Sequence, residues 1–316
     1  MTKDNAPDLA GQLSRLANQI STIIVGKRPQ IEDCIACLLA GGHLLIEDVP
    51  GVGKTTLAHA LSVSLGLRFS RMQFTADLMP SDLIGVSVYE RSKEAFAFHP
   101  GPVFTQVLLS DEINRAGPKT QSALLEAMEE HQVTVEGETR ALPSPFFVIA
   151  TQNPSDQLGT YPLPESQLDR FTMRLSIGYP SAEAEKQLMK QQRTQHPIET
   201  LGSVTDVNEI KQMQEVVRNV AIHDNLYDYI LRLAGATRNH PQLALGLSPR
   251  GALALTRATQ AIAAARGRDF ATPDDVKTVA IPVMSHRLLP HPDARLSGFS
   301  SENFAAELLK SVSVES

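Results

Sequence analysis

The chain has 316 residues, a formal net charge of -6 at pH 7 and 42 % hydrophobic residues. This length favours two domains over one, and the mild acidity argues against a large nucleic-acid-binding surface. No run approaches the ~20 consecutive apolar residues that span a bilayer, and the N-terminal segment MTKDNAPDLAG lacks the apolar stretch of a signal peptide. These properties predict a cytoplasmic protein without a membrane span.

The first half of the chain alternates short apolar runs with amphipathic segments, which is typical of a parallel α/β sheet. A strand at 43–47, a glycine-rich loop and a helix at 54–65 come first. Further strands are predicted at 68–74, 106–110, 146–150 and 173–177, and a further helix at 118–130. We therefore expect an α/β fold with five parallel core strands.

The two cysteines of the chain lie in the segment CIAC, before the first of these strands. A C-x-x-C pair can be redox-active or half of a zinc site, but no second pair of ligands follows. Apolar residues recur at helical spacing around Cys34 and Cys37. The sequence therefore predicts two small side chains on a buried helix face.

Two segments of the first half break the α/β pattern. Residues 74–104 contain alternating stretches punctuated by proline and glycine, and residues 131–142 alternate around Glu136-Gly137. Both patterns are typical of β-hairpins. We expect each to be an insert between elements of the sheet.

The strand pattern stops near Gly178. The segments that follow carry apolar residues at three- and four-residue spacing, as amphipathic helices do. The sequence thus predicts an α/β domain at 1–178 and an all-helical domain at 179–316. Residues 286–298, rich in punctuating prolines, are expected to form a loop that closes the second domain.

The loop after the first strand has the composition of a phosphate-binding loop. Its backbone N–H groups would hold nucleotide phosphates, Lys54 would add positive charge, and the Thr55 hydroxyl would bind Mg²⁺. The alternative is a glycine-rich turn that binds nothing. The residues expected to contact the nucleotide here are Pro50, Gly51, Val52, Gly53, Lys54, Thr55 and Thr56.

Asp48 occupies the position of the first glycine in the pattern G-x-x-x-x-G-K-[ST]. Aspartate tolerates the backbone angles of turns, so binding survives if its carboxylate points away from the phosphates. A carboxylate that points inward would repel the nucleotide or require a cation. We favour the first alternative.

Polar residues follow two other predicted strands. Asp111 is placed to hold Mg²⁺, and Glu112 to polarise the water that attacks the γ-phosphate. Asn153 is placed to orient that water, although Asn-Pro is also a common cap. The presence of Glu112 favours a hydrolase over a protein that only binds nucleotide.

Two arginines complete the candidate site. Arg170 follows a short predicted helix and could reach the γ-phosphate of a neighbouring subunit; a salt bridge to Asp169 or Glu165 is the alternative. Arg250 lies in the first turn of a predicted helix, where a cation is unfavourable without an anion nearby. We expect Arg250 to contact nucleotide across the domain interface, with a solvated helix end as the alternative.

Together these motifs resemble those of AAA+ ATPases, and more narrowly those of the MoxR family in the helix-2-insert branch. The hairpin at 74–104 is similar to the insert that marks this branch, and the hairpin at 131–142 to the one that precedes the sensor-1 strand. The resembling segments follow one order through most of the chain: 43–58, 73–85, 111–130, 150–171 and 247–255.

The resemblance implies a P-loop AAA+ core with a helical lid, and it implies roles for individual residues. Arg115 belongs to the family signature without a firm role. The implied roles are adenine packing for Val25 and Gly26, Walker A for Lys54 and Thr55, Walker B for Asp111 and Glu112, sensor 1 for Asn153, the arginine finger for Arg170, and sensor 2 for Arg250.

The resemblance also implies ATP and Mg²⁺ as cofactors and assembly into a hexameric ring. Proteins of the MoxR family are similar to chaperones that remodel, mature or activate protein complexes. The resemblance therefore also implies a protein client and a partner that carries a von Willebrand factor A domain. One alternative is a nucleic-acid-stimulated motor, which the acidic balance and the few basic residues of the hairpins disfavour. Another is a nucleotide-gated binding module that switches without turnover.

Overall fold

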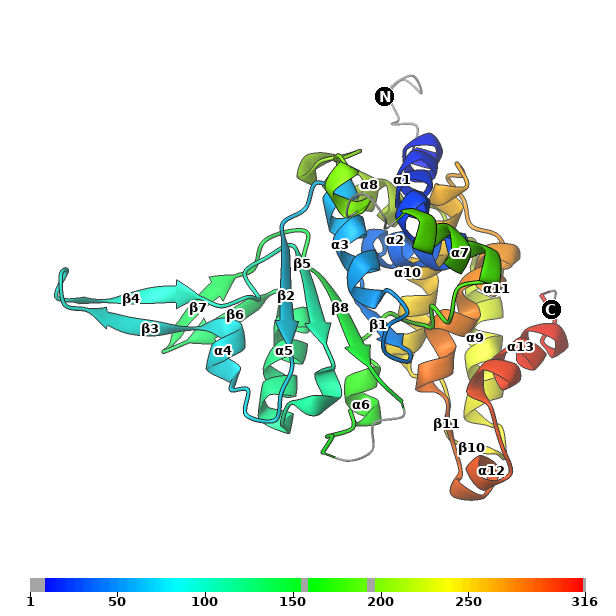
Figure 1. Ribbon diagram of the computed structural model, residues 1–316. Coiled ribbons are helices and arrows are strands. Elements are labelled where there is room, and N and C mark those ends of the chain that lie inside the picture. The colour runs from blue at the N-terminus through cyan, green and yellow to red at the C-terminus, as the bar shows by residue number, and fades with distance from the viewer. Residues whose placement is uncertain (1–8, 155–158, 192–196, 315–316) are drawn as a thin grey trace.

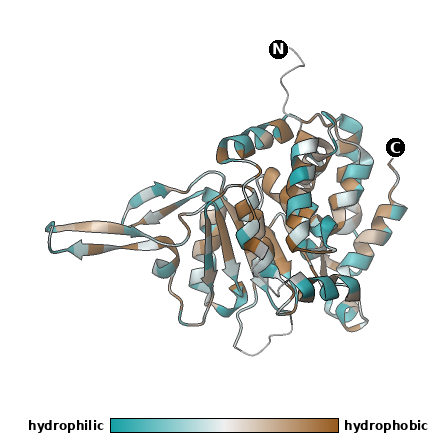
Figure 2. Cartoon of the chain, turned by 45° about the horizontal axis from the view of Figure 1, so that its top comes forward, coloured by the Kyte–Doolittle hydropathy of each residue, from teal (hydrophilic) through white to brown (hydrophobic). Residues whose placement is uncertain are grey.

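The structure, a computed structural model, describes residues 9–154, 159–191 and 197–314 (Figure 1). A parallel sheet lies between a helical part on one side and two projecting hairpins on the other. Figure 2 shows hydrophobic residues concentrated in the strands of this sheet, whereas many helices are hydrophobic along one side and hydrophilic along the other. The amphipathic pattern in the sequence therefore corresponds to burial in the fold.

The central sheet has five parallel strands in the order β2-β5-β8-β1-β9. Its strands are Leu44–Glu47 (β1), Phe69–Gln73 (β2), Val107–Asp111 (β5), Phe147–Gln152 (β8) and Met173–Leu175 (β9). The helices of this half are Leu9–Ile23 (α1), Arg28–Leu39 (α2), Lys54–Ser64 (α3), Pro80–Ile84 (α4), Pro118–Glu130 (α5) and Glu165–Leu168 (α6). The prediction of five parallel core strands is confirmed, and α1 is a helix that we did not predict.

The inserted segments form the two predicted hairpins. One pairs β3 (Gly85–Glu90) with β4 (Ala95–Pro100), and the other pairs β6 (Gln132–Val135) with β7 (Glu138–Ala141). In Figure 1 both extend from the side of the sheet away from the helical part. Neither hairpin contributes a strand to the central sheet.

Buried apolar side chains form a separate cluster on each face of the sheet. Leu44 and Ile46 belong to a cluster that includes α1, α2, α3 and helices of the second half. Leu45 belongs to the other cluster, together with apolar residues of α5 and of the second hairpin. Successive strand residues point to opposite faces, and the first cluster joins both halves of the chain through a continuous core.

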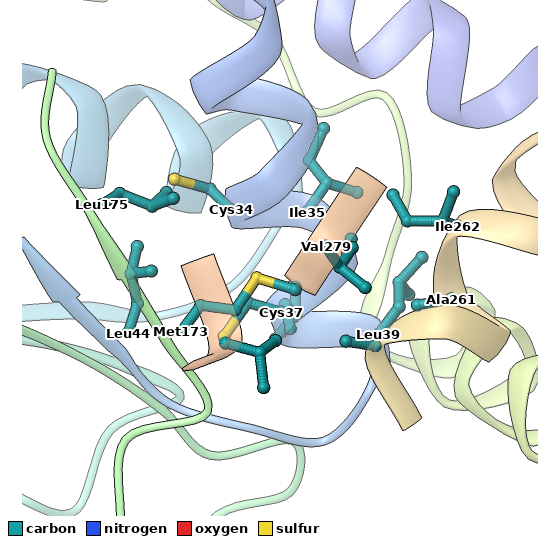
Figure 3. Packing of buried hydrophobic residues seen from close by; sticks show 14 of the residues in the cluster. Cys34, Ile35, Cys37, Leu39, Leu44, Met173, Leu175, Ala261, Ile262 and Val279 are labelled. Atoms are coloured by element: carbon teal, nitrogen blue, oxygen red, sulfur yellow. The ribbon is translucent and has the colours of Figure 1, made fainter. Parts of the chain in front are cut away.

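Cys34 and Cys37 lie on α2 within the first cluster, near Met173, Leu175 and Val279 (Figure 3). Both cysteines are free and fully buried, and burial raises the pKa of both thiols above the usual value. Within the described ranges, no group of three or more His, Cys, Asp or Glu side chains could hold a metal ion. The prediction of a buried helix face is confirmed.

The second half is mainly helical. Its described elements are Ala182–Gln191 (α7), Pro197–Thr200 (η3), Val207–Arg218 (α8), Asp224–Arg238 (α9), Leu243–Leu245 (β10), Pro249–Ala265 (α10), Pro273–Met284 (α11), Ser285–Arg287 (η4), Leu289–Pro290 (β11), Pro292–Leu296 (α12) and Ser301–Ser311 (α13). Among the described helices, none is both long enough and apolar enough to cross a bilayer.

Two expectations for this half need correction. The lid is not entirely helical, because β10 and β11 pair as a short antiparallel ladder. The segment 286–298 is not a simple loop, because it contains β11 and α12. Strands of two or three residues are too short to show a period of two, so the sequence pattern could not reveal them.

Candidate nucleotide-binding and hydrolysis site

Three of the predicted segments meet at the carboxyl edge of the sheet. The phosphate loop follows β1, Asp111 ends β5, and Asn153 follows β8. Strand β8 lies between β1 and β5, so Asn153 is placed between the phosphate loop and the acids. Ligands of open parallel sheets bind at this edge.

The phosphate loop has the backbone that close approach to phosphate requires. Gly51 and Gly53 have φ values of +84° and +93°, a conformation that side chains rarely adopt. Gly53 precedes α3 and provides no side-chain cap, so the first N–H groups of the helix are available to an anion. Thr55 and Thr56 lie in the first turn of α3, and Pro50 is exposed at the turn before Gly51.

Lys54 lies at the start of α3 with its ammonium group turned back onto the loop. Its Nζ donates a hydrogen bond to the carbonyl oxygen of Asp48 at 2.7 Å. Partial burial lowers the pKa of Lys54, against the opposing effect of the carboxylates of Asp48, Asp111 and Glu112. A phosphate would supply a negative charge next to this partly desolvated cation.

The carboxylate of Asp48 contacts the segment that follows β9, not the glycines of the loop. Its Oδ2 accepts hydrogen bonds from the backbone N–H groups of Ile177 and Gly178, both at 2.6 Å, and from the Ser176 hydroxyl at 3.2 Å. Its Oδ1 accepts from the N–H of Val49 at 2.9 Å. The structure therefore has the first of the two alternatives, in which the carboxylate points away from the phosphates.

A cavity of about 220 Å³ opens next to the loop and has mainly apolar walls. Val25 lines it, and the neighbouring Gly26 lies close to Ala184 of α7. The other walls are the glycine loop, the start of α3, the segment 177–180 and Leu188 of α7. A planar base suits such a cavity, which continues from the loop that would hold the phosphates.

The two acids after β5 are held by residues of the neighbouring strands. Asp111 accepts from the Thr151 hydroxyl at 2.6 Å and forms an ion pair with Arg71 at 2.8 Å. The Thr151 hydroxyl oxygen also accepts from the backbone N–H of Glu112 at 2.9 Å. One threonine on β8 thus fixes both acids at the end of β5.

Glu112 has a left-handed backbone, with φ +56°, that is uncommon for a residue other than glycine. Its side chain accepts from the Gln73 amide at 2.7 Å and lies 3.1 Å from Arg115 Nε. Arg115, to which no firm role was assigned from the sequence, is therefore a direct partner of the candidate base. Arg71, Gln73 and Thr151 are site residues that sequence reasoning missed.

Arg170 and Arg250 lie at the opposite, amino edge of the sheet. The N–H of Thr172 donates to the carbonyl of His43, the residue before β1, at 2.8 Å. Strands rise by about 3.3 Å per residue, so this position is roughly 16 Å from Asp48 along β1. The structure does not bring either arginine to the phosphate loop of its own chain, so the expected contact of Arg250 with nucleotide across the domain interface stays a prediction.

Both arginines pair with Glu129 near the end of α5. Arg170 Nη1 lies 3.0 Å from Glu129 Oε2 and donates to the Leu125 carbonyl at 2.8 Å. Arg250 Nη2 lies 3.0 Å from Glu129 Oε1. Glu129 is thus the anion that the position of Arg250 at a helix start requires, and Arg170 uses it in place of Asp169.

Asp169 joins the two halves of the chain at this edge. It forms an ion pair with the buried Arg287 at 2.6 Å and accepts from the Ser248 hydroxyl at 2.9 Å. Ser248 also caps α10 through the N–H of Gly251. The helix start that carries Arg250 is therefore attached to the residue before Arg170.

Arg287 strengthens this attachment through the backbone. Its guanidinium group donates to the carbonyls of Asp169, Phe171 and Thr172 at 3.0, 2.6 and 3.1 Å, and its side chain is only 2 % exposed. A guanidinium group satisfied by several carbonyls and one carboxylate is a rigid connection. This connection consequently holds Arg170 and Arg250 next to each other at the amino edge of the sheet.

Comparison with known proteins matches a segment in each half of the chain to a family model. Residues 43–173 match the family model of the ATPase family associated with various cellular activities (AAA), and residues 235–307 match the AAA lid domain. A crystal structure of a candidate ATPase from Cytophaga hutchinsonii superposes with a TM-score of 0.91 and 35 % identity, covering 96 % of this chain and 95 % of that one.

Curated relatives of similar length identify the family of this chain more closely than the family models do. The chain is 47 % identical to the uncharacterized protein YeaC of Bacillus subtilis, over 97 % of this chain and 96 % of that protein. It is 40 % identical to Chaperone MoxR1 of Mycobacterium tuberculosis (96 % and 82 % covered) and 30 % identical to Protein MoxR of Methylorubrum extorquens (88 % and 88 %). The chain therefore belongs to the MoxR family of AAA+ ATPases.

Proposed function

We propose that this ATPase works as a hexameric ring in which each chain completes the hydrolysis site of its neighbour. The observation that carries the proposal is the position of Arg170 and Arg250, at the edge of the sheet opposite their own phosphate loop. An arginine that stabilises transition-state charge must reach the γ-phosphate. These two arginines can do so only at the nucleotide of another chain, unless the lid and the finger segment move together by a large distance.

Within one chain, the carboxyl edge would bind ATP and activate water. The loop N–H groups and Lys54 hold the phosphates, and Glu112 accepts a proton from the water that Asn153 orients. Thr55 and Asp111 offer the oxygen ligands that Mg²⁺ prefers, and they would hold the ion. When bound, Mg²⁺ neutralises charge on the phosphate oxygens.

The proposed work of the ring is the remodelling or activation of partner proteins. The name Chaperone MoxR1 of one relative supports a chaperone-like role, and the family resemblance suggests a partner with a von Willebrand factor A domain. The β3–β4 hairpin exposes Val88, Tyr89 and Phe96, of which Phe96 is 72 % exposed. Apolar side chains on a projecting hairpin suit contact with protein better than contact with nucleic acid.

Assemblies mixed from two inactive variants test whether Arg170 acts on the nucleotide of a neighbouring chain. Lys54→Ala removes nucleotide binding but keeps Arg170, whereas Arg170→Ala keeps nucleotide binding but lacks the finger. If the finger acts on the neighbour, mixing these two inactive variants should restore ATP turnover that neither has alone. The control mixes Lys54→Ala with the Lys54→Ala/Arg170→Ala double variant, which should stay inactive; no recovery in the first mixture would contradict the proposal.

A second experiment separates the protein-remodelling function from its alternatives. Glu112→Gln should keep ATP bound and hold a partner protein for identification. ATP turnover that rises on addition of DNA, with steep salt dependence, would instead favour a nucleic-acid motor. Full turnover in the Glu112→Gln variant would contradict the assignment of Glu112 as the base.

A further inference from the structure

Asp48 lies at the junction of β1 and the phosphate loop, and its carboxylate accepts several hydrogen bonds. It is 7 % exposed, and two of the groups that donate to it are the backbone N–H groups of Ile177 and Gly178. These two residues follow β9, whose ladder with β1 ends at Leu175. The carboxylate therefore satisfies two N–H groups just beyond the last ladder pair at the edge of the sheet.

The segment held by Asp48 is also a wall of the cavity beside the phosphate loop. Ile177, Gly178 and Pro180 line this cavity together with Val25. The same segment is held from the other side, because Lys27 Nζ donates to the carbonyl of Tyr179 at 2.9 Å. The position of this wall thus depends on Asp48 at the start of the phosphate loop and on Lys27, two residues after Val25.

Asp48 connects to the phosphate loop through its main chain as well. Its carbonyl oxygen accepts the hydrogen bond from Lys54 Nζ, and its carboxylate accepts from the N–H of Val49. A glycine at this position, as the common phosphate-loop pattern has, would keep the carbonyl contact but lose every contact of the carboxylate. The N–H of the 4 % exposed Ile177 would then be a buried donor without this acceptor, which is costly.

We propose that Asp48 is a positioning residue that ties the phosphate loop to the wall of the base cavity, so that base and phosphates are recognised as one unit. This inference rests on the nucleotide site described above and goes beyond it. It assigns to Asp48 a part in selecting nucleotides by their base, a role that a phosphate-loop glycine cannot have. The phosphates alone should be bound without its help.

The test compares a ligand with a base and a ligand without one. Asp48→Gly should weaken ATP binding about tenfold, as expected when hydrogen bonds to a charged group are lost, and should leave the affinity for inorganic tripolyphosphate nearly unchanged. Glu47→Gln is the matched control, because Glu47 is the neighbouring carboxylate and also reaches β9, through Arg174 at 2.8 Å, without contacting residues 176–178. Both affinities should be nearly unchanged in this control.

Hydrogen exchange of the nucleotide-free protein provides a second readout that does not depend on ligand binding. In Asp48→Gly and in the near-isosteric Asp48→Asn, the N–H groups of residues 176–180 should exchange faster than in the wild type, while those of α5 do not change. The Asn variant keeps the shape of the side chain and covers the case in which the Gly variant fails to fold. Equal weakening of ATP and tripolyphosphate, no weakening of ATP, or unchanged exchange at 176–180 would overturn the proposal, whereas absence of ATP binding by the wild type would contradict the nucleotide site itself.

Discussion

At the carboxyl edge of the central sheet, acids and a lysine surround a phosphate loop, whereas at the amino edge two arginines share the carboxylate of Glu129. In the proposed function, the first set binds phosphate and activates water. In the same proposal, the second set neutralises charge in the transition state. The two sets are separated by the length of β1, so in the proposed ring each nucleotide would use the first set of one chain and the second set of its neighbour.

The two edges also differ in what holds them in place. Asp111 and Glu112 are fixed by Thr151, Arg71 and Gln73, all from strands of the same sheet. The arginine edge is fixed by lid residues, above all by Arg287. A movement of the lid would therefore move the arginines and leave the acids in place, which would link the lid of one chain to turnover in the next.

The largest expected effect is a loss of ATP turnover caused by a substitution at the carboxyl edge. Glu112→Gln removes the proton acceptor but keeps the size of the side chain, so turnover should fall by roughly 10²- to 10⁴-fold, with little change in ATP affinity. Steady-state hydrolysis and equilibrium binding measure the two effects. Gln73→Ala serves as a comparison, because it removes a partner of Glu112 without removing the base; its turnover should fall less. Equal turnover in Glu112→Gln and wild type would contradict the division between the edges.

The next largest effect is expected on stability at the amino edge. Arg287→Leu leaves the Asp169 carboxylate and several carbonyls without their partner, and breaking such a buried pair costs about 3–5 kcal/mol. Denaturant unfolding measures this loss. The control is Arg218→Ala, whose ion pair with Glu215 is exposed, 68 % and 63 % for the two side chains; its change should stay below about 1 kcal/mol. A loss no larger than that of the control would mean that Arg287 does not anchor the lid.

The sequence predicted the carboxyl edge well because its signals are local. The phosphate loop, the acids and Asn153 each follow a recognisable strand, and the helix at 118–130 has the predicted bounds. The amino edge could not be predicted in this way. Glu129 lies on a helix face like many other glutamates, and Arg287 meets Asp169 across 118 positions of the chain. Contacts of this kind depend on how the lid packs, which periodicity does not encode.

Acid should also destabilise the amino edge through His43. This residue is buried at the start of β1, where Nδ1 accepts from the N–H of Val148 and the other ring nitrogen contacts the carbonyl of Met128. Burial lowers its pKa from 6.5 to about 4. Between these values the unfolded chain binds a proton that the folded chain does not, so stability is lost as the pH falls from about 6.5 to about 4.

The loss from His43 should be on the order of 3 kcal/mol over this window, since each pKa unit corresponds to about 1.4 kcal/mol. Unfolding free energies at pH 7 and pH 4.5 should therefore differ more for the wild type than for His43→Gln. The variant will keep the contribution of other buried groups, such as His286, whose pKa burial also lowers. Identical pH dependence in the two proteins would exclude His43 as the cause.

The smallest expected effect is a change in ATP affinity on substitution of Arg250. Measuring it tests most directly whether the two edges act on different nucleotides. At concentrations where the chain is monomeric, Arg250→Ala should change ATP affinity by less than about twofold, because Arg250 pairs with Glu129 at the amino edge and a charge at that edge contributes little to the loop across solvent. In the assembled protein the same variant should reduce turnover, since Arg250 is held beside Arg170. Lys54→Ala is the reference for lost binding. If Arg250→Ala weakened ATP binding by the monomer as strongly as Lys54→Ala does, Arg250 would act on the nucleotide of its own chain, and the two edges could not be assigned to different subunits.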